Sequence, residues 1–116
     1  MQTYTGGCQC GAVRYSVTTD LAKLLTCNCS RCGKLGAILT FVPQNQFELL
    51  SGEDNLTSYL FNTKKINHLF CTTCGIESFA RGSDKEGNKT IAINVRCLDG
   101  IDPETLSPTP VDGKNW

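Results

Sequence analysis

The chain has 116 residues, 40% hydrophobic and 19% charged, a composition typical of one globular domain over residues 1–116 rather than of a disordered chain. Its 11 Lys and Arg balance 11 Asp and Glu without a concentrated basic run, which excludes the usual signature of a nucleic-acid-binding domain. The longest apolar run, around Ala37–Val42, is far shorter than the ~20 residues of a membrane span, and no signal-peptide pattern opens the chain. We therefore expect neither a nucleic-acid nor a membrane partner.

Short apolar stretches separated by turn residues recur along the chain and predict β-strands. In Ala12–Val17, the apolar side chains Val13, Tyr15 and Val17 alternate with polar ones, so this strand should bury one face. Further strands are expected at Ala37–Val42, Gln46–Leu50, Leu56–Phe61, Ile66–Phe70, Ser78–Arg81 and Thr90–Val95. Polar residues Asn62–Lys65 should connect the strands Leu56–Phe61 and Ile66–Phe70.

Helical structure is expected only in short pieces. Ser30–Leu35 fits a single helical turn, because Gly33 and Gly36 disfavour a longer helix. The tail from Asp99 onward contains three of the four prolines and is predicted to be coil, with one short turn at Pro103–Leu106. The pattern therefore predicts a mainly β domain made of small antiparallel sheets pinned by metal.

Eight cysteines in a chain of this length are more than packing requires, and they indicate either disulfides or metal ligation. Cys8 and Cys10, and likewise Cys27 and Cys29, are one residue apart, where a mutual disulfide is strained but joint metal binding is easy. Without a secretory signal, a reducing compartment such as the cytoplasm is expected. Spacing and compartment both favour metal binding over disulfides.

Four cysteines form two half-sites in distant parts of the chain: Cys8 with Cys10, and Cys71 with Cys74. The second pair lies in a Cys-x-x-Cys-Gly knuckle, a turn whose backbone amides can point at the thiolates. Structural zinc sites of the ribbon type combine two such turns in one closed set of four ligands. We predict a structural Zn²⁺ site at these four residues.

Cys27, Cys29 and Cys32 remain as a local cluster of three. One interpretation is a second structural site, completed by Cys97 or by the one histidine, His68. The other is an open site, because three protein ligands and a free position are characteristic of catalytic zinc. Such a site would accept an external thiol and hold it as a nucleophile.

Four motifs in order resemble the glutathione-dependent formaldehyde-activating enzyme family, which includes centromere protein V. They are Gly6–Tyr15, Cys27–Cys32, Phe70–Gly75 and Asn94–Asp99. Together they extend the resemblance over essentially the whole chain. It implies an Mss4-like fold with two Zn²⁺ ions, one structural and one catalytic, and assigns the catalytic ion to Cys27, Cys29 and Cys32.

The resemblance also implies a reaction, the carbon–sulfur bond formation between glutathione and formaldehyde that gives S-hydroxymethylglutathione. The expected partners are therefore a small thiol, glutathione, and a small aldehyde, and the class is a carbon–sulfur lyase. One residue departs from the family: members commonly carry His where this chain has Asn28. Asn at this position still has an amide that can donate to a thiolate.

Two cations flank the cluster of three cysteines. Arg31 and Lys34 are predicted to bind the carboxylate of the thiol substrate or a developing oxyanion, the alternative being plain solvent-exposed charge. Asp99 is expected to cap a turn before Gly100 rather than to act as a base. The alternative to the enzyme as a whole is a zinc-ribbon binding module without turnover.

Overall fold

The computed structural model describes residues 1–60 and 66–115, and strands dominate it. The strands are β1 (Gln2–Gly7), β2 (Arg14–Thr19), β3 (Leu25–Cys27), β4 (Leu39–Pro43), β5 (Phe47–Ser51), β6 (Leu56–Tyr59), β7 (Asn67–Cys71), β8 (Phe79–Ser83), β9 (Lys89–Asn94) and β10 (Thr109–Val111). The α-helix α1 (Ser30–Leu35) is a little more than one turn long. The described ranges contain no helix with the length and apolar character needed to cross a membrane.

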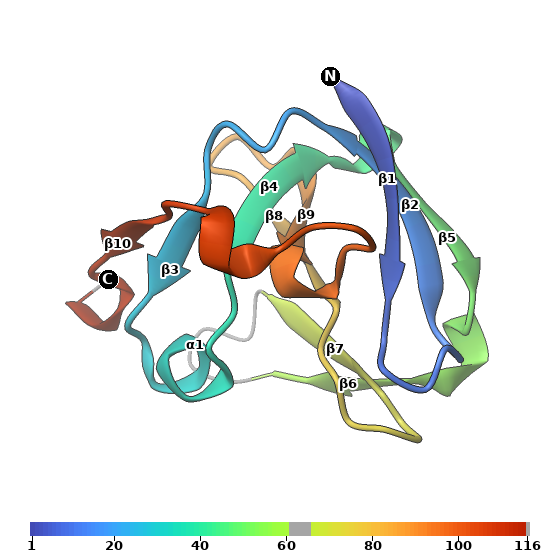
Figure 1. The fold of residues 1–116 in the computed structure, drawn as a ribbon. Coiled ribbons are helices and arrows are strands. Elements are labelled where there is room, and N and C mark those ends of the chain that lie inside the picture. The colour runs from blue at the N-terminus through green and yellow to red at the C-terminus, as the bar shows by residue number, and fades with distance from the viewer. Residues whose placement is uncertain (61–65, 116) are drawn as a thin grey trace.

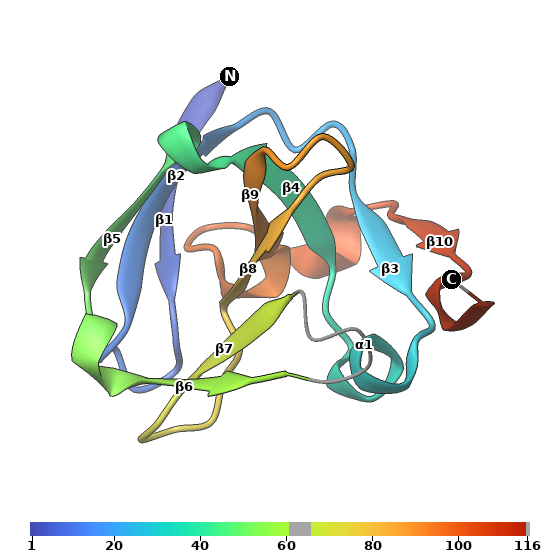
Figure 2. The ribbon, with the colours of Figure 1, turned by 180° about the vertical axis from the view of Figure 1, so that it is seen from behind.

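Two sheets form the framework, as the sequence predicted. The smaller has the order β1-β2-β5 and the larger the order β10-β3-β4-β9-β8-β7-β6. Neighbouring strands are antiparallel except β10 and β3, which run parallel. Figures 1 and 2 show the smaller sheet on one side of the molecule and β3 with β10 on the other. The prediction of a mainly β fold with antiparallel sheets is confirmed.

The core lies between the sheets and begins with the predicted alternation. Val13, Tyr15 and Val17 are each 0% exposed, as expected for one face of a half-buried strand. The Tyr15 ring packs against Phe47 on β5 and Phe79 on β8, with ring centroids 5.2 and 5.7 Å apart. Aromatic rings at such separations bury much apolar area, and the Tyr15 and Phe79 rings also meet edge to face, at an interplanar angle of 73°. The cluster joins the two sheets.

The predicted strands are present with shifted ends. Ala37 and Ile38 are buried but precede β4, and β6 ends at Tyr59. Phe61 and the predicted connection 62–65 lie outside the described residues. The predicted helical turn Ser30–Leu35 is confirmed as α1, which Gly36 ends with φ 74° in the left-handed region that suits glycine.

Three strands, β1, β3 and β10, were not predicted. β1 is mostly polar and includes Gly6 and Gly7, which we expected in a turn; the turn itself follows, with the Gly11 amide 3.3 Å from the Cys8 carbonyl oxygen. In the tail, the short turn is confirmed at Pro103–Thr105, but the expectation of coil is wrong for β10. All three strands exist because partner strands supply their hydrogen bonds, which local sequence does not record.

Candidate metal centres

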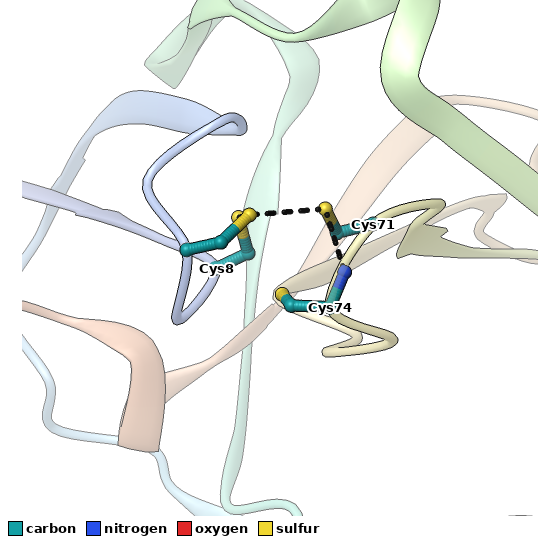
Figure 3. A group of neighbouring side chains, drawn as sticks. Cys8, Cys71 and Cys74 are labelled. Carbon is teal, nitrogen blue, oxygen red and sulfur yellow. Dashed lines mark hydrogen bonds between the residues drawn. The ribbon is translucent and has the colours of Figure 1, made fainter.

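The four predicted structural ligands come together at the junction of the two sheets. Cys8 and Cys10 lie in the turn between β1 and β2, while Cys71 ends β7 and Cys74 follows it in the knuckle. All four sulfur atoms lie within 4.8 Å of one another. Figure 3 shows the sulfurs of Cys8, Cys71 and Cys74 facing a common centre.

The sulfur separations fit a metal and exclude disulfides. Cys10 Sγ lies 3.6 Å from both Cys8 Sγ and Cys71 Sγ. Four sulfurs at a Zn–S distance of about 2.3 Å on a tetrahedron lie about 3.8 Å apart, whereas a disulfide requires about 2.05 Å. All eight cysteines are free thiols. The four-cysteine set can therefore hold a metal ion, and its donors are compatible with zinc.

Backbone and side-chain N–H groups surround this four-cysteine cluster. The Val13 amide donates to Cys8 Sγ at 3.2 Å, and the Asn55 side-chain amide donates to Cys71 Sγ at 3.3 Å. The amides of Cys10 and Ile76 lower the pKa of Cys74 to about 6. Such donors favour the thiolate form that a metal requires. The knuckle is preorganised for an ion.

The second cluster forms where β3 passes into α1. Cys27 ends β3, Cys29 is the N-cap of α1 and Cys32 lies within the helix. The three sulfurs lie within 4.8 Å of one another, so this three-cysteine cluster can also hold a metal ion. Its geometry follows from the helix start, because the Cys32 amide donates to Cys29 Sγ at 3.3 Å.

The thiols of this cluster differ in acidity. Burial raises the pKa of Cys29, but the hydrogen bonds from the Cys32 and Arg31 amides and from the Cys32 and Cys27 thiols together outweigh burial, and the net pKa is lowered. Burial, together with the neighbouring sulfurs, raises the pKa of Cys32 to about 12. A bound cation would offset the effect of burial on both thiols, because a coordinating thiol is deprotonated outright.

Within residues 1–60 and 66–115, no further His, Cys, Asp or Glu supplies a fourth ligand atom to the three-cysteine cluster. Cys97 lies in the 3₁₀ turn Val95–Cys97, and burial raises its pKa to about 11. His68 is buried on β7, with its Nδ1 3.5 Å from a carboxylate oxygen of Glu77. The alternative of a site completed by Cys97 or His68 thus finds no support in the described residues.

A cavity of about 350 Å³ adjoins the three-cysteine cluster. Cys27 and Cys32 form part of its wall, and Ile38 and Leu106 supply apolar surface. Its charged lining residues are Arg96 and Glu104, both exposed to solvent. A space of this size beside an incomplete ligand set fits a small molecule.

The two predicted substrate-binding cations lie elsewhere. Neither Arg31 nor Lys34 lines the cavity. Arg31 donates through Nε and Nη2 to one oxygen of Glu77, at 3.1 and 2.6 Å, and its guanidinium lies 4.7 Å from the centre of the Tyr59 ring. Lys34 is exposed on α1. Whether either binds substrate stays a prediction, but Arg31 already holds one carboxylate.

Sequence reasoning missed Glu77, Arg96 and Glu104. Arg96 stands next to Cys97 inside a recognised motif, which was a usable signal. Its Nε donates to the carbonyl oxygen of Gly36 at 3.1 Å, which directs the side chain to the end of α1. No local pattern marks the other two.

The remaining motif residues have structural contacts. Asn94 caps the 3₁₀ turn by accepting from the Arg96 amide at 3.2 Å, and its side-chain amide donates to the Glu77 carbonyl oxygen at 3.1 Å. Asp99 forms an ion pair with Arg14 and accepts from the Thr5 hydroxyl at 2.8 Å. The hydrogen bonds from Arg14 hold the pKa of Asp99 below its ordinary value. A carboxylate held in this way is a poor base.

Asn28, the departure from the family motif, contacts the C-terminal segment. Its side-chain amide donates to Asp112 at 2.8 Å, and its carbonyl oxygen accepts from the Lys114 amide at 3.0 Å. The amide therefore holds the chain after β10 against the three-cysteine cluster.

Comparison with known proteins agrees with this arrangement. The model of the glutathione-dependent formaldehyde-activating enzyme family matches residues 3–111, which include both clusters. The chain belongs to this family. Its fold is also similar to a crystal structure of a Rhodobacter sphaeroides protein, with a TM-score of 0.81, 33% sequence identity, and coverage of 91% of this chain and 97% of the other. The Mss4-like fold predicted from sequence is confirmed for this family member.

Proposed function

We propose that this protein is a zinc-dependent carbon–sulfur lyase of the glutathione-dependent formaldehyde-activating type, which joins a thiol to a small aldehyde. Two Zn²⁺ ions are assigned, a structural one at the four-cysteine cluster and a catalytic one at the three-cysteine cluster. The observation that carries the proposal is the cavity of about 350 Å³ whose wall contains Cys27 and Cys32. Three protein ligands beside a small-molecule cavity leave a position for substrate, which is typical of catalytic zinc sites.

When bound, a zinc ion would supply Lewis acidity that lowers the pKa of a coordinated substrate thiol. In the reaction, the thiolate sulfur adds to the carbonyl carbon, the C=O π electrons move to oxygen, and that oxygen takes up a proton. The protein residues bind and orient the thiol. Leu106 and Ile38 restrict the cavity to small reactants and exclude part of the water.

The charges around the cavity suit a thiol with an α-amino acid group, as in glutathione. Arg96 uses Nε on Gly36, which leaves its terminal N–H groups for a substrate carboxylate. Glu104 lines the same cavity and suits a substrate ammonium group. Arg31 and Lys34 remain the sequence-based candidates for the same task. The many reduced thiols favour a reducing compartment, which is the basis for placing the protein in the cytoplasm.

The test is exchange spectroscopy by NMR on glutathione and formaldehyde, comparing the rate of adduct formation with the spontaneous rate. We expect the zinc-loaded protein to accelerate exchange and Cys29→Ser to abolish that acceleration while keeping the fold and one zinc per chain. Unchanged exchange with fully loaded protein would refute the formaldehyde chemistry. It would favour the alternative, a zinc-ribbon binding module without turnover.

The same assay distinguishes which of the candidate residues bind the substrate. Arg96→Ala should raise KM for glutathione about tenfold with little change in kcat, since it contributes a charge-assisted hydrogen bond to an unreactive part of the substrate. Lys34→Ala is the matched comparison. An increase in KM only for Lys34→Ala would support the assignment made from sequence instead.

A further inference from the structure

A buried ion pair links the chain around one cysteine cluster to the helix of the other. Glu77 is 6% exposed, and one of its carboxylate oxygens accepts both Nε and Nη2 of Arg31. The other oxygen faces His68 Nδ1 at 3.5 Å. Burial raises the pKa of Glu77, but His68 and Arg31 outweigh burial and lower it. The carboxylate is therefore charged and fully engaged.

The partners come from both clusters. Glu77 is the third residue after Cys74, and His68 is the third before Cys71, so both belong to the chain that carries the knuckle. Arg31 stands between Cys29 and Cys32 on α1. Figures 1 and 2 show α1 and β7 at the same end of the molecule. The pair joins segments that are 46 residues apart in sequence.

The knuckle side of this link is rigid. The Cys71 amide donates to the Ile76 carbonyl oxygen at 3.0 Å, and the Gly75 amide donates to the Cys71 carbonyl oxygen at 2.8 Å. The backbone of Glu77 itself is held by Asn94, whose side-chain amide donates to its carbonyl oxygen at 3.1 Å. The Glu77 carboxylate is thus a fixed anchor.

Within residues 1–60 and 66–115, the helix side is held mainly at its two ends, and Asn28 bonds the C-terminal segment just before the helix begins. α1 has six residues and buries none of them, so neither propensity nor apolar packing fixes its position. Besides Arg31, the hydrogen bond from Arg96 to the Gly36 carbonyl oxygen holds its C-terminal end. The ion pair of Arg31 with Glu77 anchors the helix at a point between the two ligands Cys29 and Cys32.

We propose that Glu77 is a positioning residue for the three-cysteine metal site, holding α1 through Arg31 so that Cys29 and Cys32 point at a common ion. Partners of this kind, which contact no metal but fix its ligands, typically change metal affinity 10–100-fold when removed. The proposal rests on metal binding by the two clusters, and not on the thiol–aldehyde reaction. It adds a residue that neither the sequence motifs nor the metal ligands include.

The test is a Co²⁺ titration of the full chain under reducing conditions, with chelator competition giving the affinity of each equivalent and the visible absorption bands reporting thiolate geometry. We expect Glu77→Gln to weaken the second equivalent about 10–100-fold and alter its bands, while the first changes less than about threefold. Arg31→Gln should do the same, and the double variant should lose no more than either single one, because both remove one interaction.

Arg14→Gln is the matched control, since it breaks an ion pair with Asp99 away from α1 and should leave the affinity of the second equivalent unchanged. Arg31, with a side chain 24% exposed, provides the test if Glu77→Gln fails to fold. An unchanged second equivalent, or an equal loss at both sites, would overturn the proposal. Absence of a second equivalent in the unaltered protein would instead refute the proposed catalytic zinc.

Discussion

Gly7 passes so close to Val13 that a Cβ atom on Gly7 would lie 2.0 Å from the Val13 carbonyl oxygen. The contact closes the turn that presents Cys8 and Cys10. In the same turn, the Cys8 amide donates to that oxygen at 3.1 Å and the Val13 amide donates to Cys8 Sγ. The position of Cys8 and Cys10, two of the four ligands, therefore depends on the absence of a side chain at Gly7.

Gly7→Ala should therefore weaken the four-cysteine site and destabilise the fold by about 1–3 kcal/mol, the usual cost of overpacking. Gly11→Ala is the control: its φ of 85° is strained for alanine, but its Cβ would meet nothing within 4 Å. It should cost about 1–2 kcal/mol and leave zinc affinity unchanged. Urea unfolding and chelator competition measure both quantities. Equal zinc affinity in the two variants would contradict the steric argument.

In the zinc-loaded protein, Cys97 should react slowly with alkylating reagents, at a rate that rises with pH. Burial raises its pKa to about 11, so little thiolate is present near neutral pH. We expect alkylation by iodoacetamide to be at least ~10-fold slower at pH 8 than for a free thiol, and to rise about tenfold per pH unit between pH 7 and 10.

Intact-mass spectrometry follows this modification, with Cys97→Ser as the control that should remain unlabelled. The seven cluster cysteines are protected while zinc is bound. A labelling rate that levels off below pH 9 would show that the Cys97 pKa is not raised.

Asn28→Ala should release the C-terminal segment. The variant removes the hydrogen bonds to Asp112 and from the Lys114 amide, both at exposed positions. We expect a loss of about 1 kcal/mol in unfolding free energy and faster hydrogen exchange at the Lys114 amide. Exposed Asn45 offers a control substitution to Ala. Unaltered exchange at Lys114 would mean that Asn28 does not hold the segment.

Tyr15→Phe should destabilise the core by about 1–2 kcal/mol. The Tyr15 hydroxyl donates to the Ser78 carbonyl oxygen at 3.1 Å in a buried setting, and removing this donor leaves that oxygen, among the described residues, with the Asn94 amide alone. The ring and its contacts with Phe47 and Phe79 are retained. Chemical unfolding measures the loss, and a change below about 0.3 kcal/mol would contradict the role of the hydroxyl.

Ser78→Ala should instead stabilise the fold, by raising its free energy of unfolding. Ser78 is 1% exposed, and among the described residues its hydroxyl oxygen has no hydrogen-bond partner. Replacing an unpaired buried hydroxyl with a methyl group removes a desolvation cost, so we expect unfolding free energy to rise by up to about 1 kcal/mol. The same unfolding assay applies. A loss above about 1 kcal/mol would show that the hydroxyl is satisfied.

The sequence by itself determined both cysteine groupings and the buried face of β2. Within each half-site and within Cys27–Cys32 the spacing is local chemistry, since residues one to three apart in a turn can share an ion. The pairing of the two distant half-sites was predicted from the known construction of ribbon-type zinc sites, and the fold brings them together. The alternation of Val13, Tyr15 and Val17 is also local, because successive side chains of a strand point to opposite faces. The limit that Gly33 and Gly36 set on the length of α1 is likewise a local property of the sequence.

Only the tertiary structure decided which charged side chains lie beside the three-cysteine cluster and its cavity. Sequence proximity favoured Arg31 and Lys34, but the fold brings Glu77 to Arg31 and places Arg96 and Glu104 along the cavity. It also made a strand of β10, through parallel pairing with β3. Each of these contacts joins residues far apart in the chain, and their pairing depends on how the sheets pack rather than on any local preference.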